Sequence, residues 1–491
     1  MLKSIIFVVE AKDRRIAELE ERLKTALEEN ERLKAEIAAL KAVVATPKKH
    51  SGNSAKPPSS DIVKPPKKGK ENQRGKIGAQ KGHKQHLRQP FDESQVDKTI
   101  RLTLEACPKC GGELQATSEP PKKHQQVELV EKPFLVTEYQ QYRYWCGHCQ
   151  CYHKRKLPQE VKRAGLFGPK LISLTAYMKS SCHMSYKTLQ TFYSDAISLK
   201  ASTGFSAKQV RKVSEAVKAP YERLVKQLPH AKHIHADETG SKENGKRRWT
   251  WCFRTKDFTV FHIDKSRGSA VLKKLLGMNY AGMISSDFFS AYRKFKRISK
   301  ARLQFCWAHL IREVKFLAEN VDEKISDWGN RLLEEIRKMF SLYHSRDSLL
   351  GDDWRDKMWS CQESILKAAC SLVPANKTAE NLSNRLRSWQ KEYFRFIECN
   401  VPPTNNLCEQ TIRRVVIDRK ITQGTRSDWG NRWCERIWSV ISTCEQRGEN
   451  VMLFLRSCVD SFLQGFSLPA FLANEHPLPS NIVVKTHGMT S

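Results

Sequence analysis

The first 45 residues carry apolar side chains that alternate in steps of three and four, as the a and d positions of a heptad repeat do. These apolar positions are Val9, Ile16, Leu19, Leu23, Ala26, Leu33, Ile37, Leu40 and Val44. Asn30 falls on an a position, where a buried amide fixes the register and favours two strands. We therefore predict a coiled coil over residues 1–45 that forms a homodimer. A single amphipathic helix folded onto its own domain is the alternative.

Between residues 45 and 91 the heptad pattern stops, and prolines, glycines and basic residues accumulate. Two Pro-Pro pairs interrupt any helix, and twelve Lys or Arg residues outnumber two acidic ones, which gives a net charge of +10. Such a segment buries little apolar surface and is suited to following a phosphate backbone. We predict a flexible basic arm over residues 46–100, with a solvated linker as the alternative. The side chains expected to contact DNA include Lys67, Lys68, Lys81 and Lys84.

Two Cys-x-x-Cys pairs follow, Cys107 with Cys110 and Cys146 with Cys149. Each pair places two sulfur atoms on one turn, so together they supply four thiolates for a structural, tetrahedral Zn²⁺. We predict a zinc-binding domain over residues 101–156, in which the β-rich residues 126–144 form a hairpin between the two pairs. A redox-active pair is the alternative, although redox motifs do not normally come doubled. Other candidate ligands for the second pair are His148, Cys151 and His153.

Residues 157–230 show the periodicity of helices. Apolar side chains recur at helical spacing over residues 171–178 and 189–197, and Ser206 with Gln209 has the spacing of a capping box. Short helices joined by tight turns on a basic chain are compatible with helix-turn-helix DNA binding. A helical linker has the same pattern.

Alternating apolar and polar residues then predict three consecutive strands, over residues 233–237, 248–254 and 259–264. A helix over residues 270–276 precedes a strand that ends at Asp287, and a further strand over residues 302–306 leads into a helix. Three antiparallel strands followed by helix, strand, helix and strand is the order of a ribonuclease-H-like sheet. We expect a multidomain α+β protein with this α/β core over residues 231–311, and with Asp237 and Asp287 at neighbouring strand ends.

A helical stretch over residues 312–397 separates this sheet from its expected continuation over residues 398–450, and a C-terminal helix and tail follow over residues 451–491. Asn406 can cap a new helix that carries Glu409 in its first turn, and the two residues also form an adequate capping box. Taken singly, each acid has an ordinary structural explanation. Together, two strand-end aspartates and this glutamate suit Mg²⁺, because hard cations bind carboxylate oxygens and paired ions serve phosphodiester chemistry.

The composition favours a nucleic-acid partner. The 491 residues include 85 Lys and Arg against 53 Asp and Glu, a formal net charge of +32 with histidine neutral. Such an excess points to a polyanion. No apolar run approaches the roughly 20 residues of a membrane span, and residues 5–9 are too few for a signal peptide. Fifteen cysteines in a Lys-rich chain suggest reduced thiols in a cytosol, so we expect an intracellular, polyanion-binding protein.

These motifs resemble those of the bacterial DDE transposases of the insertion sequence 66 family, over nearly the whole chain. The matching segments are Lys56-Pro-Pro-Ser-Ser-Asp61, Gly78-Ala-Gln-Lys-Gly-His83, Cys107-x-x-Cys110-Gly-Gly, His235-Ala-Asp237-Glu-Thr239, Ser286-Asp287-x-x-x-Ala-Tyr292, Cys306-Trp-Ala-His309 and Asn405-Asn406-x-x-Glu409-x-x-Ile-Arg413. The resemblance implies that Asp237, Asp287 and Glu409 are the DDE triad, that they bind Mg²⁺ or Mn²⁺, and that the helical stretch is an insertion domain.

Several residues near these motifs allow two interpretations. Arg413 and Arg414 continue the Glu409 helix and either contact DNA or lie on a solvated face. His309 is either a helix-start histidine or a group close to the reacting phosphate. Beyond Glu409 the agreement with the family loosens, and residues from Cys434 onward do not fit its pattern.

We predict a transposase that binds the terminal inverted repeats of an insertion sequence, cleaves there and joins the ends to target DNA. Its expected partners are DNA, a second copy of the chain and, by resemblance, small accessory proteins encoded beside it. A zinc-containing DNA-binding regulator without catalysis is the main alternative. A metal-dependent hydrolase built on His233 and His235 is a third, and it would require repeated β-α units with further strand-end histidines.

Overall fold

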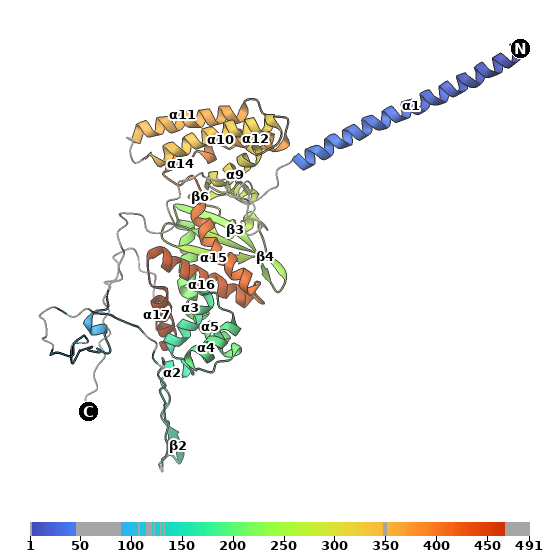
Figure 1. Ribbon diagram of the computed structural model, residues 1–491. Coiled ribbons are helices and arrows are strands. Elements are labelled where there is room, and N and C mark those ends of the chain that lie inside the picture. Colours follow the sequence, from blue (N-terminus) through green and yellow to red (C-terminus); the bar gives the residue numbers. More distant parts are fainter. Residues whose placement is uncertain are drawn as a thin grey trace. The chain divides into compact units, whose positions relative to one another are not determined.

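The computed structural model describes residues 2–45, 90–106, 109–113, 120, 123–127, 130, 133–146, 148–346 and 351–466 (Figure 1). The predicted DNA contacts Lys67, Lys68, Lys81 and Lys84, the predicted zinc ligand Cys107 and the tail beyond residue 466 lie outside the described residues. The described chain falls into two compact units, one from residues 1–65, 141–191 and 201–491 and one from residues 66–140 and 192–200.

The N-terminal segment forms one uninterrupted helix, α1 (Leu2–Ala45), of 44 residues. Where the structure describes the side chains of the predicted seam, over residues 15–37, the large apolar ones are exposed to roughly half of their full extent, between 49% and 61%. They are Ile16, Leu19, Leu23, Leu33 and Ile37. The predicted helix is therefore present, and within the described chain its apolar stripe has no cover.

The strands expected over residues 126–144 are mostly absent. Among the described residues of that stretch, strand begins only at β1 (Arg143–Cys146), which pairs antiparallel with β2 (Cys151–Lys154). Apolar side chains before β1 remain exposed, Leu135 at 98% and Val130 at 69%. Strands need a buried face to be stable, and no layer covers these residues in the described chain. Instead of separating the two cysteine pairs, the hairpin carries the second pair at its tip.

Helices precede the sheet, as the periodicity predicts: α2 (Gln159–Ala164), α3 (Pro169–Ser180), α4 (Tyr186–Ile197), α5 (Thr203–Ala216) and α6 (Lys218–Gln227). The last helix, α17 (Val451–Gln464), packs against α3 and α5. The predicted capping box at Ser206 is wrong. Ser202 caps α5 instead, accepting a 3.1 Å hydrogen bond from the Phe205 N–H, so Ser206 lies buried inside the helix.

A mixed sheet of five strands follows, in the order β5-β4-β3-β6-β7. The strands are β3 (His233–Glu243), β4 (Lys246–Arg254), β5 (Thr259–Asp264), β6 (Met283–Ser286) and β7 (Arg302–Phe305). The first three pair antiparallel, whereas β6 and β7 run parallel to β3. Contrary to the prediction, Asp237 lies inside β3 and not at its end, because β3 continues into a hairpin with β4 in which Asp237 pairs with Cys252.

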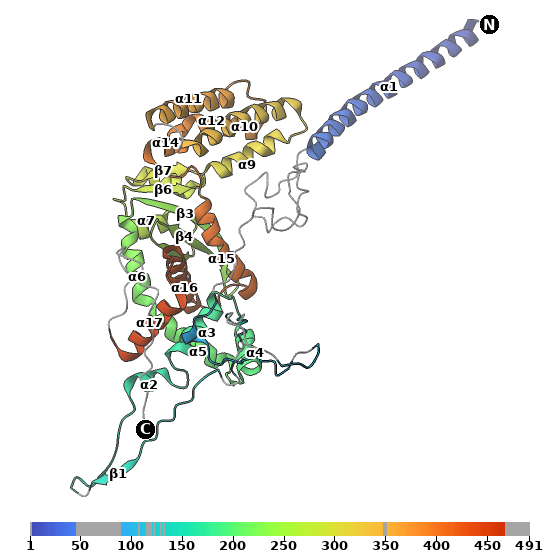
Figure 2. The same cartoon turned by 60° about the vertical axis from the view of Figure 1, so that its left-hand side comes forward.

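The two faces of this sheet are covered by different helices. Trp251 of β4 meets Tyr292 of α8 (Ser290–Ile298) edge to face, at 6.1 Å between ring centroids. On the other face, Arg254 donates a 2.6 Å hydrogen bond to the Thr411 hydroxyl of α15 (Asn406–Thr422). Figure 2 shows α6 and α7 (Ser269–Leu276) on one side of the sheet and α15 on the other. The strict alternation along β4 therefore separates two cores.

The free edge of β5 is closed by side chains of α16 (Asp428–Arg447). Four residues of helix rise about 6 Å and two residues of strand about 6.6 Å, so helix positions four apart face alternate strand amides. The three hydrogen bonds run from the N–H of Ile263 to Glu435 (2.6 Å), from Phe261 to Ser439 (2.8 Å) and from Thr259 to Thr443 (3.1 Å). Glu435, which did not fit the family pattern, thus has a structural role at this edge.

Helices between β7 and α15 form a bundle beside β6 and β7 (Figures 1 and 2). They are α9 (Trp307–Ala318), α10 (Glu323–His344), α11 (Gly351–Cys370), α12 (Lys377–Ser388), α13 (Gln390–Tyr393) and α14 (Phe396–Cys399). Two donors from the sheet side bond the Tyr393 carbonyl, the Trp307 indole at 2.7 Å and the Gln304 amide at 3.0 Å. None of the helices that the structure describes combines the length and apolar character needed to cross a lipid bilayer.

The tip of the β3–β4 hairpin is held by the turn between α15 and α16. Thr425 N–H donates to the Lys242 carbonyl at 2.9 Å, and Asn244 N–H donates to the Thr425 carbonyl at 2.8 Å. Gly424 allows this approach, because its φ is +98° and a Cβ there would lie 2.3 Å from the Lys242 oxygen.

Gly424→Ala is therefore expected to lower the free energy of unfolding by about 2 kcal/mol, through backbone strain and loss of the hairpin contact. Guanidinium titration followed by tryptophan fluorescence measures it. Gly204→Ala, in the first turn of α5 with no atom within 4 Å of the added Cβ, is the matched control. The control should be neutral or stabilising by up to about 1 kcal/mol, and equal losses for both variants would contradict the assignment.

Candidate metal centres

The register of the parallel strands brings the two predicted aspartates to one edge of the sheet. His235 of β3 pairs with Ser285 of β6, so continuing that register by two residues sets Asp237 against Asp287. Ser286 pairs in turn with Phe305, the last residue of β7 before α9 begins. Ligands commonly bind at the carboxyl ends of parallel strands, where loops and helix starts converge.

Glu409 reaches the same edge from the first turn of α15. Asn405, just before this helix, fixes its start: its amide donates to the Ala236 carbonyl at 2.8 Å and its side-chain oxygen accepts from His235 Nδ1 at 3.0 Å. Its backbone N–H donates to Cys306 Sγ at 3.1 Å. The predicted capping role of Asn406 is wrong, because α15 begins at Asn406, and the side chain of the residue before it binds β3 instead of capping the helix.

The three predicted acids lie close enough to raise the proton affinity of the most buried one. Burial raises the pKa of Asp237 well above its usual range, and the charges of Glu238, Asp287 and Glu409 raise it further. Burial also raises the pKa of Asp287, against the opposing effects of His309 and of the Phe289 N–H. Several carboxylates sharing a buried place favour either a proton or a bound cation.

A second observation at this edge points to a cation. His309 Nδ1 lies 3.4 Å from Glu409 Oε1, and both atoms are buried without a hydrogen-bond partner. The other oxygen, Glu409 Oε2, accepts from Arg312 at 3.2 Å. Unsatisfied buried acceptors of this kind suit a metal ion, and carboxylate oxygens suit a hard one such as Mg²⁺.

Cys306 completes this group by position, since its Sγ lies within 4.8 Å of ligand atoms of both His309 and Glu409. Burial, however, raises the pKa of the Cys306 thiol to about 11, and the sulfur already accepts the Asn405 N–H. A protonated thiol is a poor ligand. Cys306 is therefore less suited to bind a metal ion than the carboxylate oxygens of Glu409 and the two aspartates.

The sequence interpretation missed Glu238, a buried acid next to Asp237. Burial and the charge of Asp287 raise the pKa of Glu238 to about 7. Its carboxylate accepts from the Tyr292 hydroxyl at 2.7 Å and from Arg267 at 2.8 and 2.9 Å. The sequence contained a signal for it. Ile234, Ala236 and Glu238 lie on the same face of β3, and because the first two are apolar, the alternation predicts an apolar residue where Glu238 stands.

The two histidines of β3 are held in structural contacts. Their rings lie 4.5 Å apart, His233 Nε2 lies 2.8 Å from the Ser285 hydroxyl, and His235 binds Asn405. Burial lowers the pKa of His233 to about 4, so this ring is neutral at neutral pH. Within the described residues neither histidine belongs to a group of three ligand atoms that lie within 4.8 Å of one another, and the same is true of Asp237 and Asp287.

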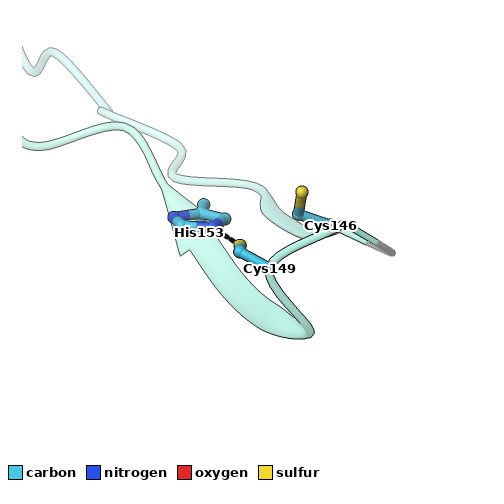
Figure 3. A group of neighbouring side chains, drawn as sticks. All are labelled: Cys146, Cys149 and His153. Atoms are coloured by element: carbon cyan, nitrogen blue, oxygen red, sulfur yellow. Dashed lines mark hydrogen bonds between the residues drawn. The ribbon is translucent and has the colours of Figure 1, made fainter.

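The hairpin β1–β2 carries a separate ligand group (Figure 3). Cys146, Cys149 and His153 place their ligand atoms within 4.8 Å of one another, with Cys149 Sγ 3.0 Å from His153 Nε2. Hydrogen bonds from the Cys149 backbone and side chain and from the His148 backbone lower the pKa of the Cys146 thiol, which favours the metal-binding thiolate. Of the candidates for this pair, His153 lies with the cysteines, whereas His148 and Cys151 are not in the group.

The comparisons with known proteins fit both centres. The family model described as "Transposase IS66 family" matches residues 164–432, and that described as "zinc-finger binding domain of transposase IS66" matches residues 105–150. Among curated proteins, "Uncharacterized protein y4qI" of Sinorhizobium fredii is 24% identical over 282 residues. This alignment covers 50% of each protein, so the chain spans about half the length of that relative. The first match contains Asp237, Asp287 and Glu409, and the second ends three residues before His153.

Loss of either Cys149 or His153 is expected to weaken zinc binding. Cys149→Ser and His153→Ala should each raise the zinc dissociation constant at least about tenfold, because each removes a ligand. Competition titration of the full chain with a colorimetric chelator measures the constant. His148→Ala is the matched control, an exposed histidine on the same turn, and it should bind zinc as the wild type does. A His153→Ala protein that matches the control would remove His153 from the ligand set.

Proposed function

Because this chain belongs to the IS66 family of transposases, we propose that it binds the ends of an insertion sequence, cuts the DNA there and joins the freed ends to target DNA. The observation that supports this most is that Asp237, Asp287 and Glu409 converge at one edge of the sheet, where the charges of the other two raise the pKa of Asp237. Three partly buried carboxylates from two strand segments and one helix form a suitable ligand set for the divalent cations that phosphodiester chemistry uses.

We further propose that the sheet is the core of a ribonuclease-H-like domain. Its support is the order and direction of the strands, three antiparallel and then two parallel, together with α7 and α8 between them. Residues 231–311 and 398–450 would form this core, and residues 312–397 the helical insertion. The zinc-binding region over residues 101–156 would serve as a separate structural module that depends on its metal, because its hairpin is too small to fold around a core of its own.

In this proposal, Asp237, Asp287 and Glu409 hold Mg²⁺ or Mn²⁺. When bound, such ions activate the attacking oxygen and stabilise the departing 3′ oxygen of the phosphodiester. The remaining residues position these ligands. Arg312 holds one oxygen of Glu409 at 3.2 Å, and the other oxygen lies 3.4 Å from His309 Nδ1. Asn405 keeps the start of α15 on β3, so that Glu409 cannot withdraw from the aspartates.

DNA would bind through the excess of basic residues that gives the chain its net charge of +32. On α15, Arg413 is exposed and available for a phosphate, whereas Arg414 pairs with Glu445. Lys67, Lys68, Lys81 and Lys84 remain predicted contacts of the basic arm. Such a protein would act at the bacterial nucleoid, and the small accessory proteins that the family resemblance implies are further partners of the proposal.

We also propose that α1 pairs with the α1 of a second copy as a parallel coiled coil. The half-exposed stripe from Ile16 to Ile37 is the support, because a helix with an uncovered heptad seam gains by burying it in a partner. A dimer suits an enzyme that must hold two DNA ends.

Removing one charge from the proposed triad should abolish cleavage without abolishing binding. Asp237→Asn, Asp287→Asn and Glu409→Gln keep side-chain size, and each is expected to slow Mg²⁺-dependent cleavage of the element ends at least about 10³-fold. Gel assays on the inverted repeats that flank the gene measure both cleavage and end binding. Asp264→Asn, at the end of β5 in the same sheet, is the matched control and should cleave normally.

Two results would count against this assignment. Full cleavage by the triad variants would remove these acids from the chemistry. Binding of the ends with an unchanged biological effect in those variants, and no cleavage in the wild type, would favour the non-catalytic regulator instead.

The coiled coil is tested by placing a charge in its seam. Leu23→Glu, at an a position, should convert the full-length dimer to a monomer, because the carboxylate would be buried against the partner helix. Light scattering after size exclusion gives the mass. Ala35→Glu, on the outer face of the same helix, is the matched control and should stay dimeric. A monomeric wild type, or dimers in both variants, would refute α1 as the dimer contact.

A further inference from the structure

Arginines from two separate elements meet beside Asp287. Phe288 follows this aspartate directly, and two guanidinium groups lie over its ring: Arg293 of α8 at 4.3 Å and Arg385 of α12 at 4.9 Å from the ring centroid. Arg297, one turn after Arg293 on α8, is close enough for its charge to act on Arg293. We call Arg293, Arg297 and Arg385 the Phe288 arginine cluster.

The cluster holds more positive charge than the described residues neutralise. Arg385 makes a bidentate pair with Glu313 of α9, at 2.8 and 3.2 Å. Neither Arg293 nor Arg297 forms an ion pair within the described chain. Burial and the charges of Arg297 and Arg385 lower the pKa of Arg293, as expected when guanidinium groups crowd together. Three guanidinium groups against one carboxylate leave an excess of two positive charges.

Hydrogen bonding at the cluster is also incomplete. The Nε atoms of Arg293 and of Arg385 are both buried, and neither has a hydrogen-bond partner. A buried donor without an acceptor costs roughly 1–3 kcal/mol, and more when the group is charged. An acceptor that carries negative charge and enters from solvent would meet the outer nitrogens of these guanidinium groups, because the Nε atoms themselves are buried. Phosphate oxygens meet both requirements and match the geometry of arginine.

The position of the cluster decides which phosphate it suits. Glu313, the partner of Arg385, is near enough to Asp287 for its charge to raise the pKa of that aspartate. Phe288 is the next residue after Asp287 in the chain. The cluster thus adjoins the proposed catalytic edge without sharing its acids.

We propose that the Phe288 arginine cluster binds a backbone phosphate of the DNA strand next to the phosphate that is cut. The inference rests on the proposed function, since it takes DNA as the substrate. It gives the helical insertion a direct part in holding that substrate, because Arg385 comes from α12 whereas Arg293 and Arg297 come from the core. Recognition of a backbone phosphate carries no sequence information, so the cluster would grip element ends and other DNA alike.

The test measures how DNA affinity depends on salt. Full-length protein in EDTA, which prevents cleavage, is titrated against a fluorescein-labelled duplex of mixed sequence at several salt concentrations. Arg293→Gln with Arg297→Gln should weaken binding about threefold to tenfold at low salt and reduce the slope of log affinity against log salt by about one. Arg293→Lys with Arg297→Lys keeps the charges and should restore the slope.

A second variant tests the contribution of the insertion. Arg385→Gln removes the guanidinium group that the insertion contributes, and the slope should again fall by about one. Glu313 keeps its access to water in this variant, because its side chain is 36% exposed. Arg337→Gln, an exposed arginine of α10 in the same insertion, is the matched control and should leave the slope unchanged.

Unchanged slopes in both cluster variants, with or without a lower melting temperature, would overturn the proposal and leave the cluster as packing between core and insertion. Tight binding of inorganic phosphate by the wild type, with unchanged DNA slopes in the variants, would also overturn it in favour of a free anion. Because binding is measured in EDTA, these outcomes do not depend on cleavage. Failure of the catalytic proposal would appear separately, as cleavage that survives in the triad variants.

Discussion

The cost of burying several carboxylates together governs the architecture around the sheet edge. Glu238 is buried and Asp237 and Asp287 are half-buried; the charges of Glu238 and Asp287 raise the pKa of Asp237, and that of Asp287 raises the pKa of Glu238. Among these acids, Glu238 has both an ion pair, with Arg267, and a hydrogen bond from the Tyr292 hydroxyl to offset the cost of its burial. No Lys or Arg of the described chain forms an ion pair with Asp237, and Glu409 Oε1 has no hydrogen-bond partner. Such an imbalance is unfavourable for an empty site and favourable for a divalent ion.

Acids that lie this close together stay in place only if the strands and helices that carry them are held rigidly. Contacts around the site hold them in this way. Asn405 fastens the start of α15 to β3 and to Cys306, while side chains of α16 occupy the free amides of β5. These contacts join segments that lie between 99 and 178 residues apart in the chain. If α15 moved away from β3, the Ala236 carbonyl and the His235 ring would both lose their partners. These hydrogen bonds thus hold α15, which carries Glu409, next to β3, which carries Asp237.

Local patterns predicted the elements of the sheet but not the contacts that align them. Alternation located β4 and β5 to within two residues, and the strand before Asp287 ended where expected. Asp237 was placed at a strand end, because the sequence does not reveal that β3 continues into its hairpin. The capping boxes at Ser206 and Asn406 failed for a related reason, since Ser202 already caps one helix and the polar residue before the other is used by the tertiary structure. Glu435 looked foreign to the family pattern, yet it accepts the amide of Ile263, a partner 172 residues away.

The helical insertion contacts the sheet through Phe288, the residue that follows Asp287. A movement of the insertion would therefore affect the position of this acid. Phe288 packs against Phe305 and Trp389, with ring centroids 4.9 and 5.9 Å apart. Because Phe288 follows Asp287 directly, a displacement of α12 or α13 would act on the aspartate through one peptide unit. The same contact holds Arg385 over the Phe288 ring. The proposed phosphate contact would therefore use side chains that also join the insertion to the residue after Asp287.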